Sequence, residues 1–291
     1  MTVYFSKALK EQFPKIHRAL ETKLLEKGIK VEQIDSDNLW CRDYMPIKIG
    51  DEFVKFAYKN NVKKYPWLHV PVDCWAGFNV RMSDIYLDGG NVVQNDNVVF
   101  MTEQVFKNNP AILRVDLRQF LRDIFEKKII YIPVEPGDDL GHADGIARFK
   151  NDKTVIINDY SLSRTLPKMP AATKKLQEAW NEYSEKLEKV ISAEGFDIVK
   201  MPWAYSQCPQ ISETEFREKY PFGDDWNPGF GYYINFFHVE DMIFLPQFGI
   251  KEDMTVMLFM QKHFSGFDIV PVDCSDLSML GGLLNCISWS D

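Results

Sequence analysis

The sequence predicts an α/β protein of five repeated modules that close into a ring. Three observations lead to this prediction. A unit of two strands, a helix and a further strand recurs along the chain. Two helix exits have the same sequence, Gly195-Phe196-Asp197-Ile198-Val199 and Gly266-Phe267-Asp268-Ile269-Val270. The first and last segments each form an incomplete module, and they complete one another only if the two termini meet.

Four stretches carry apolar side chains at helical spacing. The first covers residues 8–27, and Gly28 ends its pattern before a strand at 29–34. The other three helices are expected from about Asp116 to Phe125, from about Thr173 to Glu194 and from about Asp253 to Phe264. Each helix is followed by a run of apolar residues short enough to be a strand, which gives the last strand of its module.

Two strands precede each of the later helices. The expected pairs are 84–94 with 97–102, 144–150 with 153–158, and 231–239 with 242–247. A further pair, 40–49 with 52–58, begins a module whose helix is missing, because residues 59–82 are rich in Pro, Asn and aromatic residues without a helical period. The strand that holds Cys286 ends the chain, and the N-terminal strand, helix and strand complete its module. The total is therefore five modules.

The first strand of every module carries polar or reactive groups. In chain order these strands contain Trp40-Cys41-Arg42-Asp43, Asp88-Gly89-Gly90-Asn91, Gly141-His142-Ala143-Asp144, Tyr233-Ile234-Asn235-Phe236-Phe237 and Cys286. Ionisable groups on strands need a reason, because unpaired buried charge is costly. In a ring of modules the equivalent strand ends converge on the axis. We therefore expect these groups to meet in one pocket.

Cys286 is the predicted nucleophile. A thiol is the most nucleophilic common side chain once it is ionised, and the glycines Gly281 and Gly282 allow backbone or substrate to approach closely. Taken alone, a cysteine in an apolar segment is more often a small buried core residue. The position of Cys286 in the fifth module, where four other polar motifs are expected to converge, favours the catalytic interpretation.

Length and composition limit the classes to which the protein can belong. At 291 residues and 45% hydrophobic content the chain can form one large core, and we interpret residues 1–291 as a single catalytic domain. Five cysteines without paired spacing, and an N-terminus without a basic region before an apolar run, predict reduced thiols and a cytoplasmic protein. No apolar run approaches the length of a membrane span. The formal net charge of -8, without a basic cluster, disfavours nucleic acid and membrane partners and suits a small cationic substrate.

Five motifs in this order resemble those of agmatine deiminases and Porphyromonas-type peptidylarginine deiminases, within the guanidine-modifying pentein superfamily. The motifs are Trp40-x-Arg42-Asp43-x-x-Pro46, Asp88-Gly89-Gly90-Asn91, Gly141-His142-x-Asp144-x-x-x-x-Phe149, Asn235-Phe236 and Gly281-Gly282-x-x-Asn285-Cys286-x-Ser288. The resemblance covers nearly the whole chain and implies a five-bladed pseudo-symmetric α/β propeller, in agreement with the five modules. It implies neither a metal nor a cofactor, and it leaves homo-oligomer formation open.

The resemblance also implies roles for the motif residues. The implied catalytic residues are Cys286 as nucleophile, His142 as general acid and base, and Asp88 as a further active-site carboxylate; the implied substrate-binding residues are Asp43, Asp144, Asn235 and Trp40. The chemistry calls for these residue types. A guanidinium is planar, fully protonated and a poor electrophile, so carboxylates on its edges hold and orient it. The spacing of His142 and Asp144 predicts that both side chains lie on one face of a strand.

Two positions depart from the agmatine deiminase pattern, which usually has histidine directly before the cysteine and glutamate at the position of Asp88. This chain has Asn285 and Asp88 there. The guanidine chemistry stays plausible, and the substrate is open between agmatine, which we favour, and arginine as free acid or peptide residue. An amidinotransferase of the same superfamily and a non-catalytic binding propeller are the alternatives to a hydrolase.

A segment from Trp203 to Phe230 interrupts the module pattern, and we interpret it as a lid or pocket rim. Its charged and aromatic residues form a net acidic set, Glu213, Glu215, Asp224, Asp225 and Trp226 against Arg217 and Lys219. An acidic rim favours a substrate with a cationic tail such as agmatine. Lys63 and Lys64, in the loop without a helix, favour a carboxylate instead.

Overall fold

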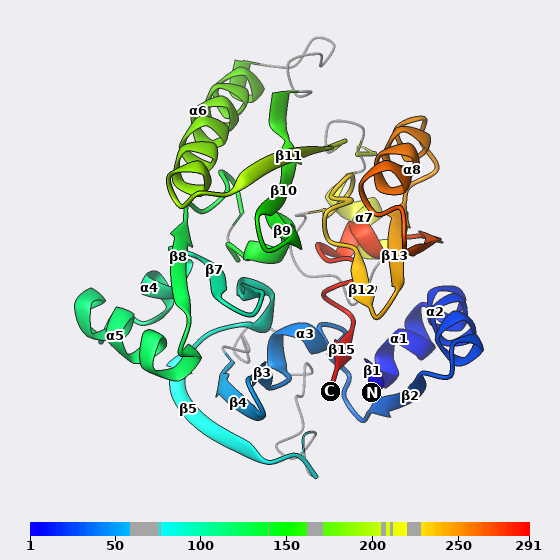
Figure 1. The fold of residues 1–291 in the computed structure, drawn as a ribbon. Coiled ribbons are helices and arrows are strands. Elements are labelled where there is room, and N and C mark those ends of the chain that lie inside the picture. The colour runs from blue at the N-terminus through cyan, green and yellow to red at the C-terminus, as the bar shows by residue number, and fades with distance from the viewer. Residues whose placement is uncertain are drawn as a thin grey trace.

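The computed structural model describes residues 1–58, 75, 77–138, 140–161, 171–204, 208–209, 212–219 and 228–291. In this part of the chain, five three-stranded sheets stand around a common centre (Figure 1). The sheets are β15–β1–β2 (Trp289–Ser290, Thr2–Ser6, Lys30–Ile34), β3–β4–β5 (Ile47–Ile49, Glu52–Ala57, Val80–Tyr86), β6–β7–β8 (Val93–Gln94, Val98–Thr102, Lys128–Ile132), β9–β10–β11 (Ala147–Asn151, Thr154–Asp159, Asp197–Pro202) and β12–β13–β14 (Phe237–Val239, Met242–Gln247, Asp268–Asp273). The predicted ring of five modules is confirmed.

Every sheet has the same internal arrangement. The first strand is antiparallel to the second, and the second is parallel to the third, as β9, β10 and β11 illustrate. A parallel pair needs a crossover connection, which the helix of the module provides. Figure 1 shows β3, β9, β12 and β15 toward the centre of the ring. The ends of these first strands therefore come together at the axis.

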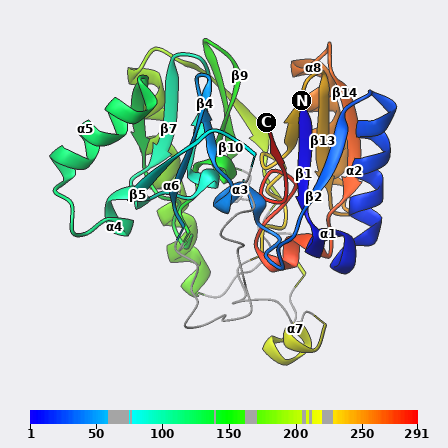
Figure 2. The same cartoon turned by 90° about the horizontal axis from the view of Figure 1, so that it is seen from below.

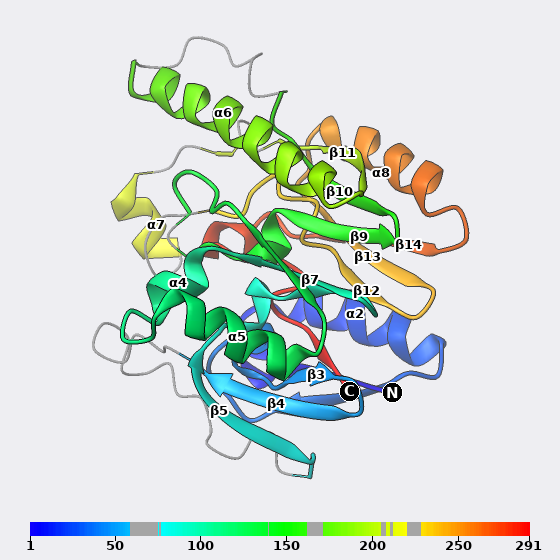
Figure 3. The ribbon, with the colours of Figure 1, turned by 60° about the vertical axis from the view of Figure 1, so that its left-hand side comes forward.

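Helices cover the outside of the ring (Figures 1 and 3). The helices between second and third strands are α1 (Lys7–Gln12) with α2 (Pro14–Glu26), α4 (Gln104–Asn108) with α5 (Arg114–Phe125), α6 (Ala171–Ala193) and α8 (Glu252–His263); α3 (Cys41–Tyr44) and α7 (Glu213–Lys219) lie outside this pattern. The helix predicted at 8–27 is divided at Phe13. Pro14 starts α2, because proline lacks an amide hydrogen and fits best in the first turn of a helix.

The strand predicted at 84–94 is wrong. The structure divides this stretch into β5, which is the third strand of the preceding sheet, and β6, which begins the next one. Between them the chain turns through a short 3₁₀ helix at Gly89–Asn91. The module that lacked a recognisable helix therefore has its third strand, while most of the stretch that was searched for the helix lies outside the described residues.

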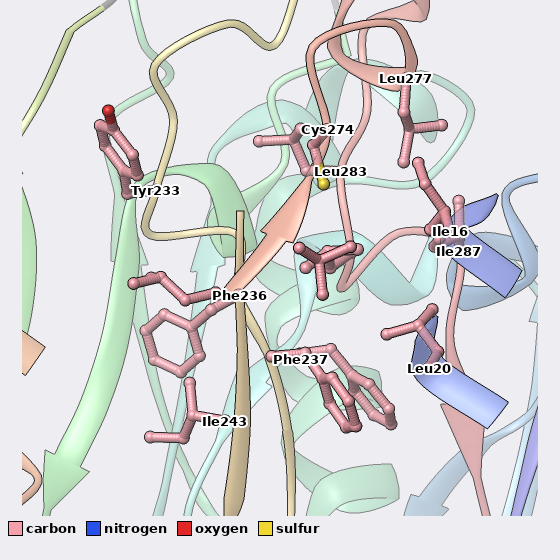
Figure 4. Packing of buried hydrophobic residues seen from close by; sticks show 14 of the residues in the cluster. Ile16, Leu20, Tyr233, Phe236, Phe237, Ile243, Cys274, Leu277, Leu283 and Ile287 are labelled. Atoms are coloured by element: carbon pink, nitrogen blue, oxygen red, sulfur yellow. The ribbon is translucent and has the colours of Figure 1, made fainter. Parts of the chain in front are cut away.

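The largest buried apolar cluster of the described residues joins the two ends of the chain. Figure 4 shows Ile16 and Leu20 of α2 on the same cluster as Phe237, Ile243 and Ile287. All five side chains are at most 6% exposed. The first helices and the last module thus share one hydrophobic core, which supports the closure of the ring.

The terminal strands close the ring directly. Val3 is paired with Ser290 and Tyr4 with Trp289 in an antiparallel ladder. The indole Nε1 of Trp289 also donates to the carbonyl oxygen of Pro46 at 2.7 Å, which links this sheet to the next one. Figure 2 shows the termini and α7 on opposite faces of the ring. Within the described ranges, no helix has the length and apolar character needed to cross a membrane.

Candidate active site

The motif residues lie just before the first strands rather than within them. His142 is extended and Asp144 belongs to a 3₁₀ helix, Ala143–Gly145, so the prediction that both sit on one face of a strand is wrong. The turn forms because the amide of Ile146 donates to the carbonyl of Ala143 at 3.0 Å. Turning the chain at this point brings both side chains to the axis before the strand begins.

The other motifs reach the axis in the same way. Asp43 lies in the short helix α3, and Asp88 directly precedes the 3₁₀ helix at Gly89–Asn91. Asn235 comes just before β12, and Cys286 lies in the turn before β15. The prediction that equivalent segments of the five modules converge is therefore confirmed at the level of the backbone.

His142 lies between two carboxylates. Its Nε2 is 3.1 Å from Oδ2 of Asp88, and its Nδ1 is 3.6 Å from Oδ1 of Asp43. Burial alone would lower the pKa of His142, but the negative charges of Asp43 and Asp88 outweigh it and hold the pKa well above its usual value. This shift favours the imidazolium form of His142 in the free protein, while burial raises the pKa of its partner Asp43 to about 7.

Gly90 makes this arrangement possible. Its amide donates to Oδ1 of Asp43 at 2.9 Å. A Cβ atom at this position would stand 2.7 Å from both Asp43 Oδ1 and His142 Nδ1, closer than real Cβ contacts allow. Gly90 thus allows three segments of the chain to approach one another closely. From the sequence alone, the Asp88-Gly89-Gly90 motif was also compatible with an ordinary turn.

The thiol of Cys286 faces Asn235 and Asp144. Its Sγ is 3.4 Å from Oδ1 of Asn235 and 3.8 Å from Oδ2 of Asp144. Burial, followed by the charges of Asp144 and Asp43, raises the pKa of Cys286 well above its usual value. The resting thiol is therefore protonated, and it donates its proton toward the asparagine oxygen.

Asn285 connects the nucleophile to three other motifs. Its Nδ2 donates to Oδ2 of Asp144 at 2.6 Å, and its backbone amide donates to Oδ1 of Asn235 at 3.2 Å. Its carbonyl accepts from Nε of Arg42 at 3.3 Å. The amide of Arg42 in turn donates to the carbonyl of Cys286 at 3.1 Å. These contacts were not predicted, because the sequence showed Asn285 only as a departure from a family pattern.

Trp40 packs against the glycine pair that precedes the cysteine. A Cβ on Gly282 would overlap the Trp40 ring, at 2.8 Å from its Cε3 and Cη2 atoms. Gly281 has φ of 92°, a conformation that favours glycine. The expectation of a close approach at this pair is correct, and the group that approaches is an indole of the first motif.

Two ionisable groups near these motifs were missed from the sequence. Arg148 lies with its guanidinium carbon 4.7 Å from the ring centroid of Phe236. Burial lowers the pKa of Arg148 to about 10, while the charges of Asp144 and Cys286 act in the opposite direction. Glu135 is 4% exposed and accepts hydrogen bonds from Tyr232 and Tyr160. Glu135 lies outside the motifs and Arg148 stands at an unspecified position of the third motif, so only their charge next to apolar neighbours could have indicated them.

The other residues that the sequence analysis singled out either lie away from the site or lie outside the described residues. The buried Cys41 has its Sγ 3.7 Å from the carbonyl of Tyr4, and burial raises its pKa to about 12. Lys219 of α7 pairs with Asp276 at 2.9 Å. The rim residues Asp224, Asp225 and Trp226, and the loop residues Lys63 and Lys64, lie outside the described residues. Among the residues that the structure does describe, no group of His, Cys, Asp or Glu is arranged to hold a metal ion.

Similar proteins were found by both sequence and structure. An agmatine deiminase of Pseudomonas aeruginosa is 23% identical, over 90% of this chain and 76% of its own length. The agmatine deiminase of Enterococcus faecalis matches with a TM-score of 0.74 at 18% identity, over 99% of this chain and 92% of that one. An agmatine deiminase of C. jejuni with substrate bound matches with a TM-score of 0.71 at 15% identity, over 99% and 92%.

At these identities the structural likeness shows the fold, a five-module α/β propeller. On this fold a thiol, an imidazole and carboxylates meet at the axis. The model of the family described as Porphyromonas-type peptidyl-arginine deiminase matches residues 3–290 and places the chain among the guanidine-modifying enzymes. The chain belongs to this family.

Proposed function

We propose that the protein hydrolyses a guanidino group to a ureido group, releases ammonia, and does so through a covalent intermediate on Cys286. One observation carries the proposal: Asp144 lies 3.8 Å from a buried thiol, while Asp43, from another module, lies 3.6 Å from a buried imidazole and adds its charge at the thiol. A cation beside these buried carboxylates offsets negative charge that is costly to bury. The planar, permanently charged guanidinium suits this task, because its edges donate hydrogen bonds to carboxylates.

Substrate charge supports ionisation of the thiol. In the free protein the pKa of Cys286 is raised by burial and by Asp144 and Asp43. A guanidinium bound between these carboxylates neutralises their effect, the pKa of the thiol falls, and the thiol releases its proton to solvent. The thiolate then attacks the central carbon of the guanidinium and forms a neutral tetrahedral adduct.

His142 then acts twice. As an imidazolium it gives its proton to one amino group of the adduct, the C–N bond breaks, and ammonia leaves from a cationic thiouronium bound to Cys286. The neutral imidazole next takes a proton from a water that attacks the same carbon. The C–S bond breaks while the hydroxyl proton of this second adduct passes to solvent, and the ureido product and the thiolate are released. Asp88 orients the imidazole through its contact with Nε2.

We propose agmatine, or a related guanidinoalkylamine, as the substrate. The sequence relative described above is an agmatine deiminase, and the net charge of -8 favours a cationic tail. Arginine, as the free acid or as a peptide residue, is the alternative, because the family as described is a peptidyl-arginine deiminase family. The lysines at 63 and 64 are the sequence feature in favour of arginine.

A substrate screen tests the proposal. The protein is incubated with agmatine, arginine, methylated arginines and peptides with internal or C-terminal arginine, and ureido product and ammonia are both measured. Agmatine is expected to have the highest kcat/KM. Stronger turnover of C-terminal arginine peptides overturns the substrate assignment, and absence of ureido product from every guanidino compound overturns the reaction.

Two further measurements separate the alternatives to a hydrolase. An amidinotransferase needs an amine acceptor, so product formation that depends on an added amine contradicts hydrolysis by water. A binding propeller needs no reactive thiol, so failure of a haloacetamidine to label Cys286 stoichiometrically contradicts catalysis. We also retain, as parts of this proposal, a single catalytic domain, a cytoplasmic location and no nucleic acid partner.

A further inference from the structure

Asn285 and Asp144 form a short, buried hydrogen bond next to the nucleophile. The 2.6 Å contact joins Asn285 Nδ2 to Asp144 Oδ2, and the two residues are 6% and 2% exposed. A carboxylate only accepts hydrogen bonds, so the NH₂ side of the amide must face it. A donor bound to a charged acceptor in a buried setting forms a stronger bond than a neutral pair.

The bond leaves the two oxygens of Asp144 in different states. Oδ2 accepts from Asn285 and also lies 3.8 Å from Sγ of Cys286. Within the part of the chain that the structure describes, no hydrogen bond reaches Oδ1 of Asp144. Oδ2 of Asp144 thus accepts a hydrogen bond from the protein, and Oδ1 is available to accept one from a ligand.

The donor is also tied to the backbone of the nucleophile. Asn285 directly precedes Cys286, its amide donates to Asn235 Oδ1 at 3.2 Å, and its carbonyl accepts from Arg42 Nε at 3.3 Å. Because both the backbone amide and the backbone carbonyl of Asn285 are hydrogen-bonded, its side chain has little freedom to move if the carboxylate of Asp144 rotates. The orientation of Asp144 is therefore fixed relative to the sulfur.

We propose that Asn285 is a positioning residue that holds Asp144 in the orientation required for guanidinium binding. The inference rests on the proposed function and adds a residue to it. A neutral amide suits this task, because it donates a hydrogen bond and leaves the full negative charge of Asp144 for the substrate. A histidine in the neutral form places its Nδ1–H at a similar distance from the backbone, so it can replace the amide.

Paired reagents test this role without requiring turnover. The cation 2-chloroacetamidine and the neutral 2-chloroacetamide have the same leaving group, and both alkylate thiols. The rate of Cys286 modification by each is followed by mass spectrometry, and their ratio is the amidine preference. We expect a clear preference in the wild type, a preference reduced about tenfold or more in Asn285→Ala through loss of a charge-assisted hydrogen bond, and a preference restored in Asn285→His.

Asn109→Ala is the matched control. Asn109 is 4% exposed and its Nδ2 donates to the carbonyls of Tyr86 and Val105, away from the motifs. Its loss should lower thermal stability and leave the amidine preference unchanged. A purely structural role of Asn285 predicts the same behaviour for Asn285→Ala, and that result overturns the inference.

If Asn285→Ala does not fold, the Asn285→Asp variant tests the positioning role of Asn285 instead. Two facing carboxylates share a proton at low pH and repel each other at high pH. We therefore expect the amidine preference of Asn285→Asp, relative to that of Asn285→His, to recover as pH falls. A pH-independent ratio between these two variants contradicts the inference. A wild type without amidine preference overturns the proposed function, and this inference with it.

Discussion

Gly282 lies against the face of the Trp40 indole so closely that no side chain fits between them. A Cβ atom at residue 282 would stand 2.8 Å from Cε3 of the ring and nearer still to a third ring carbon. Gly282→Ala should therefore displace the segment that carries Cys286. A displacement of about 1 Å is enough to cost about a hundredfold in kcat/KM. The variant is compared with wild type by steady-state kinetics on the substrate that the screen identifies.

Gly145→Ala provides a control for this prediction. No atom would lie within 4 Å of a Cβ at Gly145, so the added methyl group meets open space. Its activity should remain close to that of wild type. Equal activity of Gly282→Ala and wild type would mean that the indole moves freely, and that Trp40 does not constrain the cysteine.

Cys286→Ser should retain substrate binding and lose at least about 10³-fold in kcat, because an alcohol is a much weaker nucleophile than a thiolate. Cys41→Ser is the control, since burial raises the pKa of Cys41 to about 12 and the thiol is directed at a carbonyl. Turnover is measured by ammonia release and binding by calorimetry. Substantial activity of Cys286→Ser would exclude the covalent route.

Asp144→Asn and Asp43→Asn should both lose activity, but in different ways. Each removes a charge-assisted contact to the guanidinium, for a loss of about 10- to 100-fold in kcat/KM. Asp43 is also one of the charges that raise the pKa of His142. Asp144 contributes less to the pKa of His142 than Asp43 does, so Asp43→Asn should shift the basic limb of the kcat profile further to lower pH than Asp144→Asn does. Identical pH profiles of the two variants would remove Asp43 from contact with the general acid.

Glu135 should make the stability of the fold depend on pH. Burial raises the pKa of Glu135 to about 8, whereas an unfolded glutamate titrates near its ordinary value. The folded state therefore keeps a proton that the unfolded state releases, and stability falls as pH rises toward 8. The upper limit for one group is about 1.4 kcal/mol per pH unit.

Glu135→Gln should remove this dependence, because an amide does not titrate. The stability of the variant relative to wild type should increase between weakly acidic pH and pH 8, and then stay constant. Urea unfolding at a series of pH values measures the difference. A difference that is independent of pH would show that Glu135 is ionised in the folded protein throughout this range.

The repeat and the order of the five motifs could be read from the sequence, because each depends on local pattern. Helical spacing in α2, α5 and α6, and the glycines after α2 and α6, mark the modules without knowledge of their packing. The convergence of the motifs followed from ring geometry. The sequence alone therefore predicts that Asp43 and Cys286, although distant along the chain, lie in one site.

The remaining details depend on packing between modules, which leaves no local pattern. The turn at Ala143–Gly145 replaced an expected strand because the chain must bend at the axis to present both His142 and Asp144. The hydrogen bonds of Asn285 reach residues 50 and 141 positions away. Glu135 is buried by tyrosines of two other modules. None of these contacts can be predicted from a fixed spacing of residues along the sequence.

The pairing of β1 with β15 has a consequence for the newly made chain. β1 is synthesised before its antiparallel partner β15 and before Cys286. Until both are made, the edge of β1 is open and the carboxylates of the axis have no Cys286 beside them. Under the proposed mechanism, a chain that stops short of Cys286 therefore cannot react with guanidino compounds.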